Sequence, residues 1–214
     1  FPLEYCFRMA RDYGFDGIEI WGGRPHAYPW DMDAQAARNI LELKDKYGIE
    51  VPMYTPSAIG LPVCLCSTME KEREEGVRYF KRSIEAAAAI EAPRVLIVAD
   101  DCVDLIRDVN MPNLYAMMDV VPPTIVNEPF SEYFTKLGDR MDYIHICNSD
   151  GKTDAHLCLD NGVIPVYDMF RVFKHWNYGG YVTAEIYSVA FRDPELFLAN
   201  TARILKEIRN ELEI

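Results

Sequence analysis

Two carboxylates and one imidazole stand in predicted strands of this 214-residue chain at positions where they would face the same way. Asp119, His145 and Glu185 each alternate with apolar neighbours, so each side chain lies on the strand face opposite those neighbours. Glu19, in an earlier predicted strand, follows the same alternation. Carboxylate and imidazole ligands suit Mn²⁺, Mg²⁺, Co²⁺ or Zn²⁺. Asp119, His145 and Glu185 are therefore candidate ligands of a divalent metal.

Each candidate ligand also has a plainer interpretation. Asp119 precedes a pair of prolines and could form a turn, a lone histidine in a strand is usually a hydrogen-bonded core residue, and Glu185 could reach solvent. The predicted strands that carry them contain no Lys or Arg, however, and a buried carboxylate is costly unless it is paired or binds a metal. The shared alternation therefore favours a common site.

Alternating helices and strands must position these residues. Helical periodicity covers residues 3–13, 33–47, 68–90, 102–109, 129–137, 166–176 and 193–213. Within the long helix at 68–90, the apolar positions include Val77, Phe80, Ile84 and Ala88. Apolar extended segments lie at 17–21, 50–55, 94–99, 114–121, 141–147 and 181–187. This order is typical of a parallel sheet covered by helices.

The number of predicted strands is too small for a closed (β/α)8 barrel. A doubly wound sheet is not favoured either, because the chain has no glycine-rich phosphate-binding motif. The chain begins on a helix at Phe1, and the helix after Asp100 and Asp101 is short. One strand missing at each of these two places would complete eight strands. We therefore expect residues to be omitted before Phe1 and near 100–101.

Composition and charge restrict the class of protein. Twenty-two basic and 34 acidic residues give a net charge of −12, which argues against a nucleic-acid partner. No apolar window approaches the ~18 residues of a membrane span and no leader precedes the first helix, so we expect a soluble cytoplasmic protein without a membrane partner. The six cysteines have scattered spacings, which predicts reduced thiols rather than a disulfide framework.

Several motifs together resemble one family of barrel enzymes. They are GFDGIEIWGGRPH at residues 14–26, YTP at 54–56, MMD at 117–119, IHI at 144–146 with SDG at 149–151, and AE at 184–185. This combination resembles the xylose-isomerase-like sugar phosphate isomerase/epimerase family. The resemblance implies a single (β/α)8 TIM-barrel domain over residues 1–214 whose first and fifth strands are missing from this sequence.

The resemblance also implies a metal-dependent isomerase. The family binds its divalent metal through Glu, Asp, His and Glu, of which the last three correspond to Asp119, His145 and Glu185, whereas the first belongs to the missing fifth strand. Glu185 would also be a catalytic acid/base, moving a proton next to a metal-polarised carbonyl. The expected substrate is a small sugar, either a ketose or an Amadori-type ketosamine. Assembly into a homo-oligomer remains open.

Residues near the predicted strand ends are candidate sugar contacts. Trp21, Arg24, His26 and Tyr54 follow strand ends in loops rich in Gly and Pro, where binding groups are often carried, and Glu19 shares the inward alternation. Aromatic residues of this kind are, however, more often core residues than ligand contacts. Both interpretations, contact with a sugar and packing in the core, therefore stay open for these residues.

Two alternatives to an epimerase stay open. Asp154-Ala155-His156 resembles the Asp-x-His ligand pair of endonuclease IV, a metal phosphodiesterase on the same barrel. Against it, Pro122 removes another ligand of that enzyme and the acidic charge is wrong for DNA. We therefore keep His156 as a candidate substrate contact. The second alternative is a sugar-binding barrel that has lost its catalytic activity because the missing segment held an essential Glu.

Overall fold

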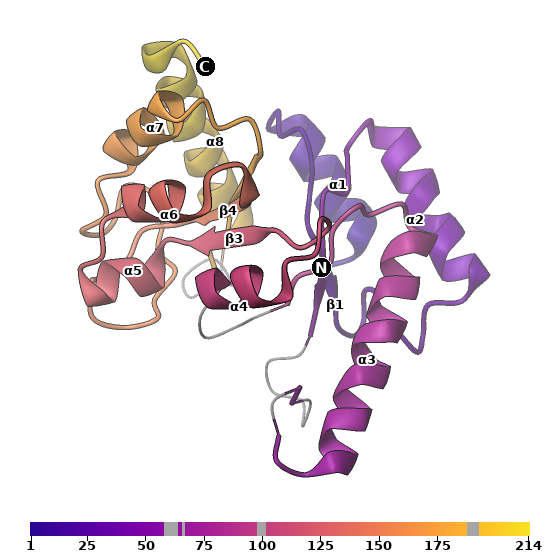
Figure 1. Ribbon diagram of the computed structural model, residues 1–214. Coiled ribbons are helices and arrows are strands. Elements are labelled where there is room, and N and C mark those ends of the chain that lie inside the picture. Colours follow the sequence, from indigo (N-terminus) through magenta and orange to yellow (C-terminus); the bar gives the residue numbers. More distant parts are fainter. Residues whose placement is uncertain (58–63, 66, 98–101, 188–192) are drawn as a thin grey trace. The chain divides into compact units, whose positions relative to one another are not determined.

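The computed structural model describes residues 1–57, 64–65, 67–97, 102–187 and 193–214. The chain divides into two compact units, unit 1 (Phe1–Val98) and unit 2 (Ala99–Ile214) (Figure 1). The predicted omission near Asp100 and Asp101 falls outside the described residues. The single domain expected over residues 1–214 stays a prediction.

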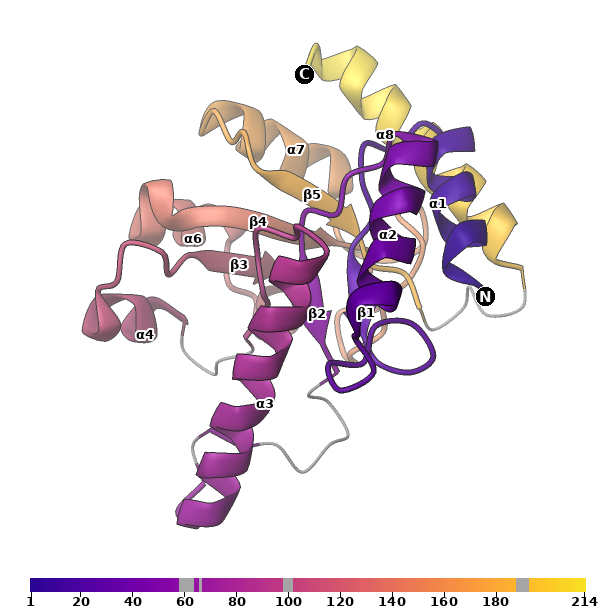
Figure 2. The same cartoon turned by 90° about the vertical axis from the view of Figure 1, so that its right-hand side faces the viewer.

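Unit 1 contains a short parallel sheet and three helices. Its elements are α1 (Leu3–Asp12), β1 (Ile20–Gly22), α2 (Ala34–Tyr47), β2 (Tyr54–Pro56) and α3 (Glu70–Ala89). Strands β1 and β2 lie side by side, with Ile20 opposite Tyr54 (Figure 2). An isolated parallel bridge from Tyr54 to Val95 extends the pairing to the next extended segment. The predicted strands at 17–21 and 50–55 are therefore confirmed, though as shorter regular elements.

Helix α2 shows how local sequence fixes its ends. The carboxylate of Asp33 accepts hydrogen bonds from the backbone N–H groups of Gln35 at 2.9 Å and Ala36 at 2.8 Å. Such an N-cap stabilises a helix by about 1 kcal/mol. At the other end Gly48 has φ 61°, the left-handed conformation that glycine adopts without steric cost. The helix predicted over 33–47 is therefore confirmed.

Helix α3 buries Tyr79 and several small residues, and it leaves two of its branched apolar residues exposed. Gly76, Ser83 and Ala86 are buried, whereas Val77 and Ile84 are 44% and 54% exposed. The helix packs against β2 and α2. Small side chains on the packed face allow a helix to approach its neighbours closely, which leaves the branched residues on the outer face. The helical period predicted from the apolar residues is correct, but it does not mark the buried face.

Unit 2 contains a three-stranded parallel sheet in the order β3-β4-β5. Its elements are α4 (Cys102–Val109), β3 (Ala116–Asp119), α5 (Val121–Val126), α6 (Phe130–Leu137), a 3-10 turn (Gly138–Arg140), β4 (Met141–Ile146), α7 (Val166–His175), β5 (Tyr181–Ala184) and α8 (Pro194–Leu212). Helix α5 is absent from the predicted elements, and its first residue, Val121, falls in the strand predicted over 114–121. Pro122 and Pro123 occupy the first turn of α5. Proline lacks a backbone N–H, and in the first turn of a helix that group would have no intrahelical acceptor, so no hydrogen bond is lost.

One face of the unit 2 sheet packs against helices. Met118, Ile144 and Ile146 are almost fully buried in an apolar cluster that also contains Phe134 of α6 and Phe173 of α7. Helix α6 contacts α7 and β4, and α7 contacts α8 (Figure 1). The side chains predicted to face the helices, those alternating with the polar ones, are therefore confirmed as core residues. Among the described helices, none combines the length and apolar character needed to cross a membrane.

Candidate metal centre

The strand register of unit 2 places the candidate ligands at one edge of the sheet. Asp119 of β3 pairs with His145 of β4, and His145 pairs with Thr183 of β5. Glu185 lies two residues after Thr183, and its backbone N–H donates to the carbonyl of Ile146 at 3.0 Å. Because residues two apart on a strand share a face, Asp119, His145 and Glu185 lie on the same face. That face is opposite the helix-packed one.

The donor atoms of these three side chains lie close together. One ligand atom from each residue falls within 4.8 Å of the others. Nδ1 of His145 lies 3.1 Å from Oε2 of Glu185. The Oδ1 atom of Asp119 accepts the backbone N–H of Val121 at 2.9 Å, which fixes the carboxylate at the end of its strand. His145 is 4% exposed, so the imidazole lies at the base of the group.

The electrostatics of the centre keep the carboxylate of Glu185 ionised. Burial raises the pKa of Asp119, and the nearby Glu185 carboxylate raises it further. Burial also opposes ionisation of Glu185, but hydrogen bonds from His145 and His156 outweigh it and lower its pKa to about 2. Positive charge beside Glu185 therefore stabilises its carboxylate, as a divalent cation would. The oxygen, nitrogen and oxygen donors fit a hard to borderline divalent ion.

His156, predicted as a substrate contact, lies in the same cluster. Its Nε2 atom is 3.8 Å from Oδ2 of Asp119, and its Nδ1 atom is 3.3 Å from Oε2 of Glu185. The imidazole is buried and stacks on Tyr187 with ring centroids 4.3 Å apart. Burial lowers the pKa of His156, but hydrogen bonds to Cys147 and Glu185 outweigh this effect and raise it to about 11. His156 therefore contacts the candidate ligands directly.

A buried asparagine holds the loop that carries His156. Asn148 exchanges backbone hydrogen bonds with Leu157 at 2.9 and 2.8 Å. Its side-chain amide donates to the carbonyls of Leu159 and Ile164 and accepts the N–H groups of Ser149 and Ile164. These contacts fix residues on both sides of His156. Asn148 is not among the residues predicted from the sequence, where its signal is a polar residue shortly after an apolar strand.

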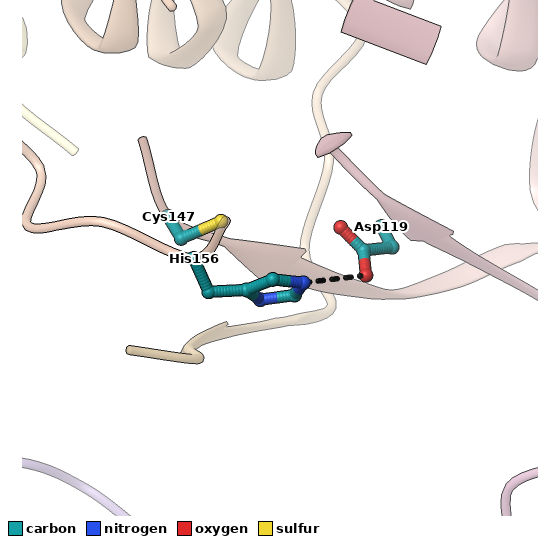
Figure 3. Close-up of side chains that lie close together, drawn as sticks. All are labelled: Asp119, Cys147 and His156. Carbon is teal, nitrogen blue, oxygen red and sulfur yellow. Dashed lines mark ion pairs between the residues drawn. The ribbon is translucent and has the colours of Figure 1, made fainter. Parts of the chain in front are cut away.

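Cys147 is a second residue that the sequence analysis missed. It follows β4 directly, is 1% exposed and lies with Asp119 and His156 in one cluster of potential ligand atoms (Figure 3). Of the cysteines that the structure describes as free thiols, Cys147 and Cys158 are buried, whereas Cys64 is exposed and Cys6 is half-buried. The available sequence signal for Cys147 is its position as the last residue of the segment predicted as a strand over 141–147, which also contains His145.

The other predicted sugar contacts lie in unit 1. Trp21 is 48% exposed and its ring meets the ring of His26 edge to face. The guanidinium of Arg24 forms an ion pair with Asp31 and lies 4.5 Å from the ring centroid of Tyr28. Nε2 of His26 lies 2.8 Å from the carbonyl oxygen of Phe1, within hydrogen-bond distance. Trp21 lies within β1 rather than in a loop, whereas Arg24 and His26 lie in the loop that follows it. The contact of these residues with a sugar stays a prediction.

Tyr54 and Glu19 have packing and hydrogen-bonding roles within unit 1. Tyr54 does not lie in a loop, as the sequence analysis expected, but begins β2 and is fully buried. Its hydroxyl donates to the carbonyl of Ala27 at 2.6 Å, and its ring lies where a Cβ on Gly22 would be. Glu19 accepts a hydrogen bond from the Thr55 hydroxyl. The structure thus assigns Tyr54 to the core of unit 1.

Comparison with known proteins identifies the family to which the chain belongs. A family model described as a xylose isomerase-like TIM barrel matches residues 7–100 and 99–208. The chain belongs to this family, and the match confirms the barrel fold class predicted from its motifs. The two matched segments meet where the sequence analysis expected omitted residues.

Individual relatives narrow the comparison to sugar epimerases. The chain is 28% identical to fructoselysine 3-epimerases of Shigella flexneri and of an Escherichia coli strain, over 246 residues that cover 92% of this chain and 89% and 90% of those proteins. These relatives support the predicted enzyme class, an isomerase of the sugar-epimerase type. The alignment is longer than the 214-residue chain itself.

Solved structures show the same fold. A D-psicose 3-epimerase crystallised with D-fructose has a TM-score of 0.79 at 13% identity, over 98% of this chain and 93% of that one. A 3-keto-D-glucoside 4-epimerase from E. coli has a TM-score of 0.73 at 14% identity, over 98% of this chain and 95% of that one. At such identities the likeness concerns the fold alone.

Proposed function

We propose that the protein is a divalent-metal-dependent sugar epimerase whose metal is bound by Asp119, His145 and Glu185. The observation that carries this proposal is the parallel register of β3, β4 and β5, which brings the three donor groups within 4.8 Å of one another. Active sites of TIM barrels lie at the carboxyl ends of the strands, where Asp119 and Glu185 stand. Mn²⁺, Co²⁺, Mg²⁺ and Zn²⁺ all suit these donors.

The proposed substrate is a ketose or a ketosamine of the fructoselysine type. Support comes from the relatives, which are fructoselysine 3-epimerases at 28% identity. Trp21 of β1, with Arg24 and His26 in the loop after it, offers an aromatic surface and polar groups of the kind that bind sugars. We propose these three residues and Glu19 as sugar contacts of unit 1, and separately His156 as a sugar contact of unit 2; the fully buried Tyr54 keeps its core role.

A bound divalent ion would polarise the carbonyl of such a sugar and stabilise the negative charge that develops on its oxygen. Glu185 is the residue that we propose removes or returns the proton on the neighbouring carbon. With a pKa of about 2 its carboxylate is ionised at neutral pH, as a proton acceptor must be. His145 and His156 both hold its Oε2 atom and thereby orient the carboxylate.

Epimerisation needs a second acid/base group on the other side of the sugar carbon. The family resemblance assigns this role to a Glu in the fifth strand. We propose that the natural protein carries this strand in a segment omitted near Asp100 and Asp101. Intact mass spectrometry tests the omission: a mass several kDa above 24.6 kDa supports it. A mass of 24.6 kDa would instead favour the catalytically inactive sugar-binding barrel.

Exchange of substrate protons into deuterated water tests the proposed activity. Purified protein loaded with Mn²⁺ is incubated with free ketoses, ketose phosphates and fructosyl-amines, and deuterium at the carbon next to the carbonyl is followed by NMR. We expect exchange with at least one ketose class, and its loss in Glu185→Gln but not in the control Glu75→Gln, which alters an exposed residue of α3.

The same preparation distinguishes the alternatives. Exchange with phosphorylated sugars only would reassign the protein to sugar-phosphate isomerisation. Absence of exchange with every ketose, together with cleavage of a phosphodiester in abasic DNA, would favour the endonuclease IV-like reaction suggested by Asp154 and His156. Absence of both activities in the metal-loaded protein would overturn the proposed enzyme.

A further inference from the structure

Cys147 takes no part in the proposed reaction, yet it lies against the candidate metal centre. Its thiol is buried. The sulfur atom, one oxygen of Asp119 and one nitrogen of His156 all lie within 4.8 Å of one another. Figure 3 shows these three side chains converging from β3, from the end of β4 and from the loop that follows it. A buried cysteine is usually a small apolar packing residue, so the nature of its neighbours decides its role.

The orientation of His156 is that of a metal-binding histidine. Its Nδ1 atom lies 3.1 Å from the backbone carbonyl oxygen of Glu185, so that this nitrogen is the donor. Nε2 faces two carboxylates, with Oδ1 of the exposed Asp154 at 3.4 Å and Oδ2 of Asp119 at 3.8 Å. Histidine ligands typically donate their second nitrogen to a carbonyl or carboxylate, which fixes the tautomer that binds the metal. Nε2, on the carboxylate side of the ring, is therefore the nitrogen that would bind an ion after it loses its proton.

The spacing of the donors also fits a small divalent ion. Zinc binds sulfur at about 2.3 Å and nitrogen or oxygen at about 2.0–2.2 Å, so tetrahedral donors lie roughly 3.5 Å apart. The 3.8 Å between His156 and Asp119 is close to this value. Stacking on Tyr187 and the hydrogen bonds of Asn148 hold the imidazole and its loop in place. The group is thus ordered before any ion binds.

We propose that Asp119, Cys147 and His156 form a second metal site that binds a thiophilic divalent ion such as Zn²⁺ or Co²⁺. Sulfur and imidazole donors select such ions over Mg²⁺ and Mn²⁺, which prefer oxygen. On binding, the thiol proton of Cys147 leaves to solvent and the thiolate becomes the ligand. This second site is additional to the proposed epimerase centre, although both use Asp119. One carboxylate can serve both sites, because a carboxylate can bridge two ions about 3.5–4 Å apart.

Optical titration with Co²⁺ tests the second site. Reduced protein is titrated with Co²⁺ alone, and a near-ultraviolet charge-transfer band reports a bond between cobalt and a thiolate. We expect the band in the wild type and its loss in Cys147→Ser, with Zn²⁺ affinity lowered by roughly tenfold or more. Cys158→Ser is the matched control, because Cys158 is also buried, at 5% exposure, but belongs to neither candidate ligand group found among the described residues. We expect Cys158→Ser to keep the band.

Two further variants keep the proposal falsifiable and separate it from the proposed function. His156→Gln should weaken the band even if Cys147→Ser does not fold. His145→Ala removes a ligand of the proposed epimerase centre but none of the second site, so it should keep the band while losing Mn²⁺ affinity. A wild type that binds Co²⁺ without the band, or a band that survives in Cys147→Ser, would overturn the second site whatever the fate of the epimerase activity.

Discussion

Truncation of Asn148 should destabilise unit 2 more than any surface change in the same loop. The side-chain amide makes four hydrogen bonds: to the carbonyls of Leu159 at 2.9 Å and Ile164 at 3.3 Å, and from the N–H groups of Ser149 at 2.9 Å and Ile164 at 2.8 Å. At about 1 kcal/mol for each bond, Asn148→Ala should lower the free energy of unfolding by about 4 kcal/mol. The residue is 3% exposed, so water cannot readily replace these bonds.

Urea unfolding followed by the fluorescence of Trp176 measures this effect. Of the three tryptophans, Trp21 and Trp30 belong to unit 1, so replacing both by Phe leaves Trp176 as the reporter of unit 2. With an m value of about 2 kcal/mol/M, a loss of about 4 kcal/mol moves the midpoint down by about 2 M urea.

Two variants control for loop composition and for partial loss of the hydrogen bonds. Asn161→Ala alters an exposed asparagine of the same loop and should change the unfolding free energy by less than about 0.5 kcal/mol. Asn148→Asp keeps the two accepted bonds, loses the two donated ones and should fall between the wild type and Asn148→Ala. Equal midpoints for Asn148→Ala and Asn161→Ala would refute the structural role of the amide.

Four other variants test the electrostatics and the packing. The folded-state pKa of Glu185 is lowered from 4.5 to about 2, so its contribution to stability is complete above pH 4.5 and is lost as pH falls through about 2. Glu185→Gln should therefore flatten the decline of the urea midpoint between these pH values. An unchanged slope would contradict the lowered pKa of Glu185. Gly22→Ala places a Cβ 2.4 Å from the hydroxyl oxygen of Tyr54 and should cost about 1–3 kcal/mol in thermal unfolding, whereas a neutral effect would show that the ring can move. Ile144→Ala should cost about 3 kcal/mol and Ile84→Ala less than about 0.5, since the first is fully buried and the second is 54% exposed; similar losses would contradict the buried face of α3.

The placement of the candidate ligands was predictable because it depends on a local pattern. Apolar residues at every second position fix which face of β3 and β4 packs against the helices, and therefore that Asp119 and His145 share the other face. Parallel strands in register then bring their ends together. Helix α2 was predictable for a similar reason, since Asp33 and Gly48 mark its ends directly.

Features that depend on distant contacts were not predictable in this way. The buried face of α3 is decided by which small residues meet β2 and α2, so the exposed Val77 and Ile84 could not be distinguished from core residues by their type. Tyr54 is buried because Gly22, on the neighbouring strand, leaves room for its ring. The approach of Cys147 to His156 depends on how Asn148 folds the intervening loop, and no local periodicity reports that.

Retention of Mn²⁺ after dialysis tests the central claim most directly, because this oxygen-preferring ion reports the proposed epimerase centre rather than the thiolate site. The double variant His145→Ala, Glu185→Gln removes two of the three proposed ligands, and His175→Ala, Glu75→Gln changes the same residue types at exposed positions. We predict that the wild type and the control retain Mn²⁺ while the first double variant loses it, with at least a tenfold weaker affinity. Equal retention by all three proteins would contradict a metal centre at Asp119, His145 and Glu185.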